Sequence, residues 1–366
     1  MSQQKNKSQL NVLLLSPSFS SKGGVSNYSR LLIEQMDEIN LHHFPQISHK
    51  KNLLFPFLFL NDLIRFNRKI LNFKPHIIHV NPSLGWNSIL RDFFFILIAK
   101  VKNIKSLLFL RGWGRSSIHQ FFGGRNIVSL FLRIFFTLPD KIITLASIFR
   151  DQIRKTSPNH LDVELSTTMV STDNFSVTKR LFENPKNILF CGRIKNFKGI
   201  YELLLSMPLI LHHFPQTTLT YMGDGPELKS LRRRIIKHNL QNSVKVIGHK
   251  SGFSKFKIYK ESDLFVLPSY NEGFPNVYCE ALASGLPIVT TLVGGVYDYF
   301  EEGIQGLSIS NPPVPRDIAK KIIYLFNDPK LMTKMGNYNM YLAKSKLDVD
   351  VLVSEMKNRY VRMANI

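Results

Sequence analysis

Basic and acidic side chains follow two apolar runs in the second half of the sequence. Arg193 and Lys198 lie five residues apart after the run NILFC, and Glu272 and Glu280 lie eight residues apart after the run DLFVLP. A forked guanidinium beside a compact ammonium can neutralise a diphosphate. Carboxylates accept hydrogen bonds from hydroxyl groups such as those of a sugar. These residue types favour a site for a phosphorylated, hydroxyl-rich molecule.

The segment between the two glutamates predicts a turn that leads into a helix near Asn276. Backbone N–H groups at such a helix start can hold an anion. Glu280 would lie one turn into this helix among apolar residues, where a buried carboxylate needs hydrogen-bond donors. Two simpler interpretations stay open at this point. Arg193 and Lys198 can form a solvated basic turn, and Glu280 can be half exposed or paired with a lysine or arginine.

A second candidate anion site lies near the start of the chain. The apolar run that ends at Leu15 is followed by SPSFSSKGGVSNYSR, with Gly23 and Gly24 at the entrance of a helix expected from about Val25. Glycines let backbone N–H groups approach an anion closely, and the helix start favours negative charge. Lys22 adds a positive charge. The alternative is an ordinary strand–helix turn, since the segment is neither a G-x-G-x-x-G fingerprint nor a Walker loop.

Short apolar runs alternate with helical patterns along the whole chain, which predicts an α/β protein with parallel sheets. Two such series predict two doubly wound domains. We expect an N-terminal domain over residues 1–170, a C-terminal domain over 171–347 and a terminal helix over 348–366 that packs back on the first domain. The expected strands are Val12–Leu15, Ile77–Val80, Ser106–Leu110, Lys141–Leu145, Asn187–Cys191, Thr218–Met222, Val244–Ile247, Leu264–Leu267 and Ile288–Thr290.

Composition narrows the class of protein. The 366 residues carry a formal net charge of +22, with 44% hydrophobic and 20% charged residues, as in a folded protein with phosphate-bearing or anionic partners. Two isolated cysteines give no disulfide framework and fit a reduced, cytoplasmic compartment. The polar start MSQQKNKSQL has no apolar core of a signal peptide. No uncharged apolar stretch is long enough for a transmembrane helix.

Taken together and in order, GRIKNFKG, YMGDGPELKSL, VIGH and SDLFVLPSYNEGFPNVYCEALASGLPIVTTLVGG resemble the donor half of the family 4 retaining glycosyltransferases. Glu272 and Glu280 match the E-x7-E motif of that family. The resemblance is strong over residues 185–300 and loose in the first half. It implies the GT-B fold, in which two Rossmann-like doubly wound domains face each other across a cleft.

The resemblance also implies roles for individual residues. Arg193 and Lys198 would hold the diphosphate of a nucleoside-diphosphate sugar, Glu280 the ribose hydroxyls, and Glu272 the hydroxyls of the transferred sugar. The turn 246–249 would border the base. The further donor-binding residues that it implies are Gly23, Gly24, Gly192, Gly248, His249, Phe274 and Asn276. Such enzymes retain the anomeric configuration and need no metal or other cofactor. The one Asp-x-Asp, at 348–350, is interpreted as the acidic start of a helix.

One position departs from the family pattern. The family carries a histidine after a first-domain strand, whereas the corresponding run here reads LLFLRGWGR, with Arg111 in that place. Arginine cannot act as a general base but can bind a phosphate or a donor-sugar hydroxyl, so Arg111 is included among the catalytic candidates. His79 and His119 lie nearby in the sequence, and a structural role is the simpler interpretation of each.

The first half also combines basic residues with aromatic and aliphatic clusters, in SILRDFFFILIAKVKNIK and RNIVSLFLRIFFTLPDK. A basic amphipathic face can lie on an anionic bilayer. We therefore expect a cytoplasmic protein, peripheral on the inner face of the cell membrane. Its acceptor would be a saccharide or lipid-linked oligosaccharide in surface polysaccharide synthesis. The alternative is that these runs are buried helices. No nucleic-acid motif is found.

Two other functions stay open from the sequence. A sugar-nucleotide epimerase on the same fold would use the donor without an acceptor, although the E-x7-E motif in its EGFPN context argues against it. A non-catalytic partner protein that kept the fold and the nucleotide pocket is suggested by Arg111. The retention of Glu272, Glu280, Arg193 and Lys198 argues against that alternative.

Overall fold

A computed structural model describes residues 10–20, 23–46, 55–82, 86–111, 127–156, 162–175 and 179–365. The chain divides into two compact units. Unit 1 is formed by Met1–Thr167 together with Val349–Ile366, and unit 2 by Thr168–Asp348. The boundaries expected from the sequence, after residues 170 and 347, lie close to these points. The separate roles given to the two domains stay predictions.

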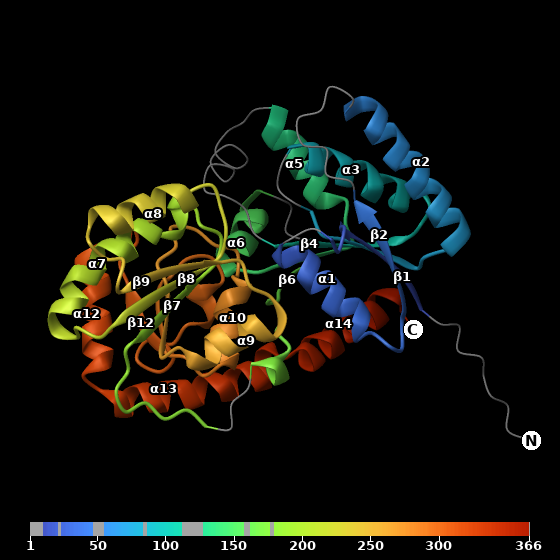
Figure 1. The fold of residues 1–366 in the computed structure, drawn as a ribbon. Helices are drawn as coiled ribbons and strands as arrows, with labels where there is room; N and C mark the ends of the chain where they lie inside the picture. Colours follow the sequence, from blue (N-terminus) through green and yellow to red (C-terminus); the bar gives the residue numbers. More distant parts are fainter. Residues whose placement is uncertain are drawn as a thin grey trace, which may run out of the picture. The chain divides into compact units, whose positions relative to one another are not determined.

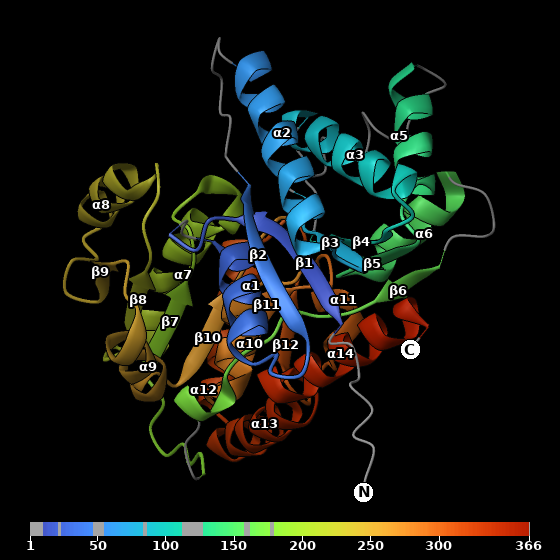
Figure 2. The same ribbon diagram turned by 90° about the vertical axis from the view of Figure 1, so that its right-hand side faces the viewer.

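In the described residues, unit 1 contains a parallel sheet of six strands in the order β2-β1-β3-β4-β5-β6. The central strands are buried over most of their length because helices cover both faces of the sheet. Figures 1 and 2 show α2, α3 and α5 over one face and α1 and α14 over the other. The strands are β1 (Asn11–Pro17), β2 (Asn40–Gln46), β3 (Ile77–Val80), β4 (Lys105–Leu110), β5 (Lys141–Thr144) and β6 (Val163–Leu165).

The helices of unit 1 follow the strands in alternation, as expected from the sequence. Helix α14 completes the unit from the far end of the chain. The bounds are α1 (Gly24–Glu34), α2 (Phe55–Phe73), α3 (Trp86–Val101), α5 (Ile127–Thr137), α6 (Ser147–Thr156) and α14 (Val349–Ala364).

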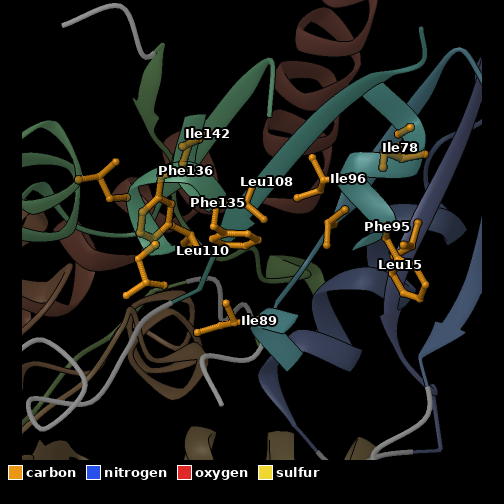
Figure 3. Packing of buried hydrophobic residues seen from close by; sticks show 14 of the residues in the cluster. Leu15, Ile78, Ile89, Phe95, Ile96, Leu108, Leu110, Phe135, Phe136 and Ile142 are labelled. Atoms are coloured by element: carbon orange, nitrogen blue, oxygen red, sulfur yellow. The ribbon is translucent and has the colours of Figure 1, made fainter. Parts of the chain in front are cut away.

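The core of unit 1 lies between the sheet and helices α2, α3 and α5 (Figure 3). Figure 3 shows Phe135 and Phe136 of α5 packed near Leu110, and Phe95 of α3 beside Leu15. Burial of each such side chain contributes roughly 1.5–3 kcal/mol, so this layer is a main source of the stability of the unit. The apolar runs of α3 and α5 therefore pack largely against the sheet. On the sides of α3 and α5 that face the sheet, the interpretation of these runs as buried helices is correct.

Unit 2 repeats the plan with a parallel sheet of six strands, among the residues described, in the order β12-β11-β10-β7-β8-β9. Its strands are β7 (Asn187–Cys191), β8 (Thr218–Met222), β9 (Val244–Gly248), β10 (Leu264–Leu267), β11 (Ile288–Thr291) and β12 (Gly306–Ile309).

The helices of unit 2 pack in two groups. Helix α7 packs along α12, as Figure 1 shows, and α10 packs along α13. Asp328 caps the start of α13 through a bond from the backbone N–H of Leu331 (2.9 Å), and Pro329 takes the first helical position. The helices are α7 (Ile200–His213), α8 (Leu228–Lys237), α9 (Gly252–Glu261), α10 (Asn276–Ala283), α11 (Val296–Tyr299), α12 (Pro315–Phe326) and α13 (Pro329–Leu342).

All nine strands predicted from apolar runs are present, and the predicted helices at Val25, Asn276 and 348–363 are confirmed with small shifts of their ends. Three strands were not predicted: β2, β6 and β12, which are all edge strands of their sheets. An edge strand is open to solvent on one side, so it lacks the continuous apolar run of a central strand. The burial of β2, for example, alternates along most of its length.

Asp348 and Asp350 lie at the start of α14, as expected. The side chain of Asp348 is buried and accepts a hydrogen bond from the hydroxyl of Thr172. Val170 pairs with Asp348 in an isolated parallel bridge, so the segments that lead into and out of unit 2 lie side by side. No cluster of three or more His, Cys, Asp or Glu side chains that could hold a metal occurs in the described residues. None of the described helices is long and apolar enough to span a membrane.

Candidate functional site at the carboxyl edge of the unit 2 sheet

The order of the unit 2 strands places the candidate residues at a reversal of the winding. From β7 the chain continues to β8 and β9 on one side, then returns to β10 on the other side of β7. Ligands of open α/β sheets bind outside the carboxyl ends of the two strands at such a point. Arg193 and Lys198 follow β7, and Glu272 follows β10. Residues far apart in the sequence are thus brought to one edge of the sheet.

The two loops at this edge are in direct contact. The backbone N–H of Tyr270 donates to the carbonyl of Phe197 (2.9 Å). Gly199 has a positive φ of 68°, and a Cβ at this position would lie 2.0 Å from the carbonyl oxygen of Pro268. Only glycine allows this approach of the two backbones, so Gly199 fixes the position of the preceding residue, Lys198.

Lys198 forms an ion pair with Glu272. Both side chains are largely buried, with 15% and 9% of their surface exposed. The same carboxylate oxygen of Glu272 accepts a bond from the hydroxyl of Ser269 (2.8 Å). The pair brings a cation and a carboxylate to one point, where the first suits a phosphate and the second a hydroxyl group.

Arg193 lies in the same loop as Lys198 and is exposed. It makes no hydrogen bond or ion pair with any residue that the structure describes, so its five donors are available to a ligand. The neighbouring Gly192 has φ +156°, and its carbonyl lies 1.8 Å from the place where a Cβ of Gly223 would stand. This close packing of the β7 and β8 loops sets the direction in which the chain leaves β7.

Glu280 lies on α10 and is 7% exposed. One oxygen of its carboxylate pairs with Lys255, and the other accepts a bond from the hydroxyl of Tyr259 (2.8 Å). Burial opposes the charge on Lys255, but attraction to Glu280 outweighs it and the pKa of Lys255 is raised. The alternative in which Glu280 pairs with a lysine is therefore confirmed, whereas half exposure is not found.

Cys191 ends β7 beside this cluster. Burial and the negative charge of Glu280 raise the pKa of the Cys191 thiol to about 12, so the thiol stays protonated and is not a nucleophile. The cluster is thus built to fix one carboxylate, that of Glu280, in a single orientation.

The other predicted donor-binding residues of unit 2 differ in accessibility. Phe274 is buried against Tyr278 and Tyr299, so its ring belongs to the core and only its backbone could meet a ligand. Asn276 begins α10, and its side-chain oxygen accepts a bond from Thr168 (2.7 Å). The remaining pair lies at the end of β9, where Gly248 has φ 72° and His249 is exposed.

The predicted residues of unit 1 lie at the corresponding edge of their own sheet. Gly23 and Gly24 are exposed at the start of α1, and a Cβ on Gly23 would meet no atom within 4 Å. Arg111 follows β4, and its guanidinium lies 3.7 Å from the ring centroid of Tyr28 and 4.7 Å from that of Phe109. Lys22 and His119 lie outside the described residues.

His79 has a structural environment, as the simpler interpretation held. It is fully buried in β3, and its Nδ1 bonds the hydroxyl of Tyr360 on α14 (2.5 Å). Burial, with the nearby charge of Arg111, lowers the pKa of His79 to about 3. The ring is therefore neutral at physiological pH.

Three residues of the unit 2 site were not found from the sequence: Lys255, Tyr259 and Ser269. Lys255 and Tyr259 stand four residues apart on α9, so they share one face of that helix. That spacing was a usable signal, but nothing in the sequence indicates that this face meets α10. Ser269 lies three residues before Glu272, and serine at that spacing is common in turns, so the sequence gives no specific signal for it.

Residues 171–340 match the family Glycosyl transferases group 1. The chain is 28% identical over 182 residues to a glycogen synthase of Mycobacterium tuberculosis, covering 49% of this chain and 43% of the synthase. It is 30% identical over 172 residues to the capsular polysaccharide biosynthesis glycosyltransferase CapM of Staphylococcus aureus, covering 47% and 44%. The chain thus matches less than half the length of each of these relatives.

Solved structures resemble the whole chain. The sucrose-phosphate synthase of Thermosynechococcus elongatus has a TM-score of 0.78 at 18% identity, covering 97% of this chain and 99% of the other. The Anabaena protein HepE, solved in complex with UDP and glucose, has a TM-score of 0.74 at 14% identity, covering 97% and 100%. At these identities the likeness establishes the fold. The predicted α/β fold of the GT-B type, with two Rossmann-like units, is confirmed.

Proposed function

Because residues 171–340 match the family Glycosyl transferases group 1, we propose that the protein is a retaining glycosyltransferase that uses a nucleoside-diphosphate sugar. The observation that carries the proposal is the ion pair of Lys198 and Glu272 where β7 and β10 end, with the exposed Arg193 beside it. This arrangement supplies cations for a diphosphate and a carboxylate for the attached sugar at one edge of the sheet.

In this proposal each charged residue contacts a different part of the donor. Arg193 and Lys198 bind the diphosphate, the first as a forked donor and the second as a compact charge. The first backbone N–H groups of α10 face the same anion. Glu272 accepts hydrogen bonds from the transferred sugar, and Glu280, held by Lys255 and Tyr259, accepts them from the ribose. The pairs with lysine hold both carboxylates in place before the donor arrives.

The chemistry that follows is departure of the nucleoside diphosphate. Breaking the bond between the anomeric carbon and the phosphate oxygen adds negative charge to the diphosphate. Arg193 and Lys198 therefore stabilise the transition state more than the bound donor. The departing phosphate takes the proton of the acceptor hydroxyl as that hydroxyl attacks from the same face, which retains the configuration. No metal is required, since the protein's own cations meet the charge.

The acceptor in this proposal is a saccharide, carried on a lipid in surface polysaccharide synthesis. The similarity to CapM, named for capsular polysaccharide biosynthesis, supports this class of acceptor. On α5, Leu130 and Ile134 are 57% and 45% exposed, and the exposed Arg133 lies beside them. A helix face of this kind suits the surface of an anionic membrane. We therefore propose a cytoplasmic, peripheral location at the inner face of the membrane.

Calorimetric titration of the purified protein with UDP, GDP, ADP and CMP tests the donor site. UDP is the first candidate, because HepE was solved with UDP. The comparison uses wild type, Arg193→Ala and the control Arg232→Ala, which removes an exposed arginine from α8. We expect one nucleoside diphosphate to bind, with affinity lowered about tenfold or more in Arg193→Ala, or roughly 1.4 kcal/mol, and unchanged in the control.

The opposite outcome is equally informative. If a folded wild-type protein binds none of the four nucleotides at millimolar concentration, the donor site is wrong and the protein is a non-catalytic member of the fold. If one binds but a matched sugar nucleotide is only isomerised when no acceptor is present, the epimerase alternative replaces glycosyl transfer.

A further inference from the structure

A basic groove lies in unit 1 between the edge strand β2 and helix α2, which Figure 2 shows running alongside each other. Its volume is about 370 Å³, within the range of small-molecule sites. Among the described residues, its walls hold three cations, two imidazoles and no carboxylate. The lining residues are His42, His43, Phe44, Pro45, Arg65, Arg68, Lys69 and Asn72.

Two of the three cations are held in place. The guanidinium of Arg65 bonds the buried Asp62 (3.1 Å) and lies 5.4 Å from the ring centroid of Phe44. The ammonium of Lys69 donates to Nε2 of His42 (2.8 Å) and lies over the ring of Phe73. Each contact uses only part of the hydrogen-bonding capacity, so Arg65 and Lys69 both retain free donors.

The third cation, Arg68, is exposed and has no ion pair or hydrogen bond with a residue in the described ranges. Arg65 and Lys69 stand four residues apart on α2, a spacing at which like charges repel across one helical turn. Burial first, and the charge of the neighbouring Lys69 second, lower the pKa of His42. Bound negative charge would relieve this repulsion.

An apolar stripe borders the groove on the same helix. Leu60, Ile64 and Leu71 recur at spacings of four and seven residues, so they share one side of α2. They are 56%, 46% and 56% exposed. Arg68 lies four residues beyond Ile64, between this stripe and the groove. A ligand with its phosphate in the groove could therefore place an apolar portion along the stripe.

We propose that the groove between β2 and α2 is a second anion site, which binds a phosphoryl group through Arg65, Arg68 and Lys69. None of the residues that line the groove is a candidate for the donor site. Planar guanidinium groups and a lysine ammonium together match the oxygen atoms of a phosphate or pyrophosphate. The phosphoryl group can belong to a soluble molecule or to a lipid headgroup.

The test uses the full-length protein with two probes. Soluble pyrophosphate is titrated calorimetrically in the presence of saturating UDP. Binding to vesicles is measured by sedimentation, with phosphatidylcholine alone and with phosphatidylcholine mixed with phosphatidylglycerol. The variant is Arg68→Gln/Lys69→Gln. The matched control, Arg232→Gln/Arg233→Gln, removes the same charge from adjacent exposed positions of α8. The single variant Arg68→Gln covers the case in which loss of Lys69 disturbs folding.

We expect Arg68→Gln/Lys69→Gln to weaken binding of one probe about tenfold or more, while the control stays within about twofold. Loss of pyrophosphate binding assigns the site to a soluble phosphorylated ligand. Loss that is confined to the phosphatidylglycerol vesicles assigns it to a headgroup. Equal losses in the two double variants, or no binding of either probe by the wild type, overturn the proposal. Titration of UDP alone into the same variants tests the donor site. Failure of the proposed donor site can therefore be distinguished from failure of the proposed second anion site.

Discussion

At the carboxyl edge of the unit 2 sheet, lysines neutralise two glutamates, whereas at the same edge of the unit 1 sheet a guanidinium packs over aromatic rings. In unit 2 the pairs are Lys198 with Glu272 and Lys255 with Glu280. In unit 1 Arg111 lies over Tyr28 and Phe109. The ion pairs of unit 2 can offer charge of both signs to a ligand. In unit 1 the attraction between the guanidinium of Arg111 and the two rings holds the side chains at the sheet edge together.

The difference shows that two parallel sheets of similar plan can use the same edge differently. The two sheets have the same number of described strands, all parallel, and each contains a reversal of the winding, although the strand order differs between them. What differs is the set of side chains that follow the strands. In unit 2 they are poised for a charged ligand, and in unit 1 the neutral, buried His79 and its partner Tyr360 serve the fold.

The largest effect that sharpens this comparison is expected from Lys198→Met. If Lys198 stabilises the departing diphosphate, its loss should lower kcat by about 10²–10³-fold, or roughly 2.7–4 kcal/mol. The control is Lys195→Met. It removes a lysine of the same loop whose ammonium lies over Phe197 and forms no ion pair with a carboxylate among the residues that the structure describes. Turnover of the sugar nucleotide with a saccharide acceptor measures both. Equal losses of kcat in the two variants would show that turnover depends on the net positive charge of the loop and not on the position of Lys198.

A smaller effect, on stability, is expected from the glycines at the two predicted phosphate loops. In unit 2, Gly199→Ala places a Cβ 2.0 Å from a backbone oxygen at a left-handed φ of 68°. The free energy of unfolding should fall by about 2–3 kcal/mol. In unit 1, Gly23→Ala meets open space at an extended φ of 174°, so the change should stay within about 0.5 kcal/mol. Scanning calorimetry of both variants makes the comparison.

If Gly23→Ala proved as destabilising as Gly199→Ala, the first loop would be as closely packed as the second. The contrast between the units would then be lost. If instead Gly23→Ala left stability unchanged but weakened nucleotide binding, the first loop would take part in the donor site, as the sequence resemblance implies.

The last effect, which develops only in acid, concerns the pH dependence of unit 1. The pKa of His79 is lowered to about 3 in the folded state from an ordinary value near 6.5. The unfolded chain therefore binds a proton that the folded chain does not. The contribution of His79 to stability is complete above about pH 6.5 and is lost as the pH falls toward 3, by up to about 1.4 kcal/mol per pH unit.

Urea denaturation of wild type and His79→Gln at several pH values checks this expectation. Both tryptophans of the sequence, Trp86 and Trp113, belong to unit 1, so their fluorescence reports its unfolding. The difference in unfolding free energy between the two proteins should shrink steadily below pH 6.5. Parallel curves would mean that His79 takes up a proton equally well in the folded and unfolded states.

The same comparison explains how much could be predicted from the sequence. The charged residues of unit 2 lie in short segments directly after their strands, so Arg193, Lys198, Glu272 and Glu280 could be named from local patterns alone. Their lysine and tyrosine partners on α9 could not, because they depend on how two helices pack. In unit 1, the contact between His79 and Tyr360 joins residues 281 positions apart, beyond the reach of any local pattern.

For the fold, the central strands could be predicted because burial on both faces imposes continuous apolar runs. The strands β2, β6 and β12 were not predicted, and all three lie at sheet edges; the fourth edge strand, β9, was predicted over Val244–Ile247. The edge strand β2 also forms a wall of the basic groove, so the element that sequence patterns missed carries the further binding site proposed here.

The return of α14 to unit 1 has a consequence for synthesis of the chain. Unit 2 is one continuous segment, so all of it has been made before the residues of α14 are added. Unit 1 must wait, because Tyr360, which covers His79, is made only after the whole of unit 2. Since domains fold as units during translation, we expect unit 2 to reach its native state first. Unit 1 would remain open, and in need of protection from aggregation, until α14 has been made.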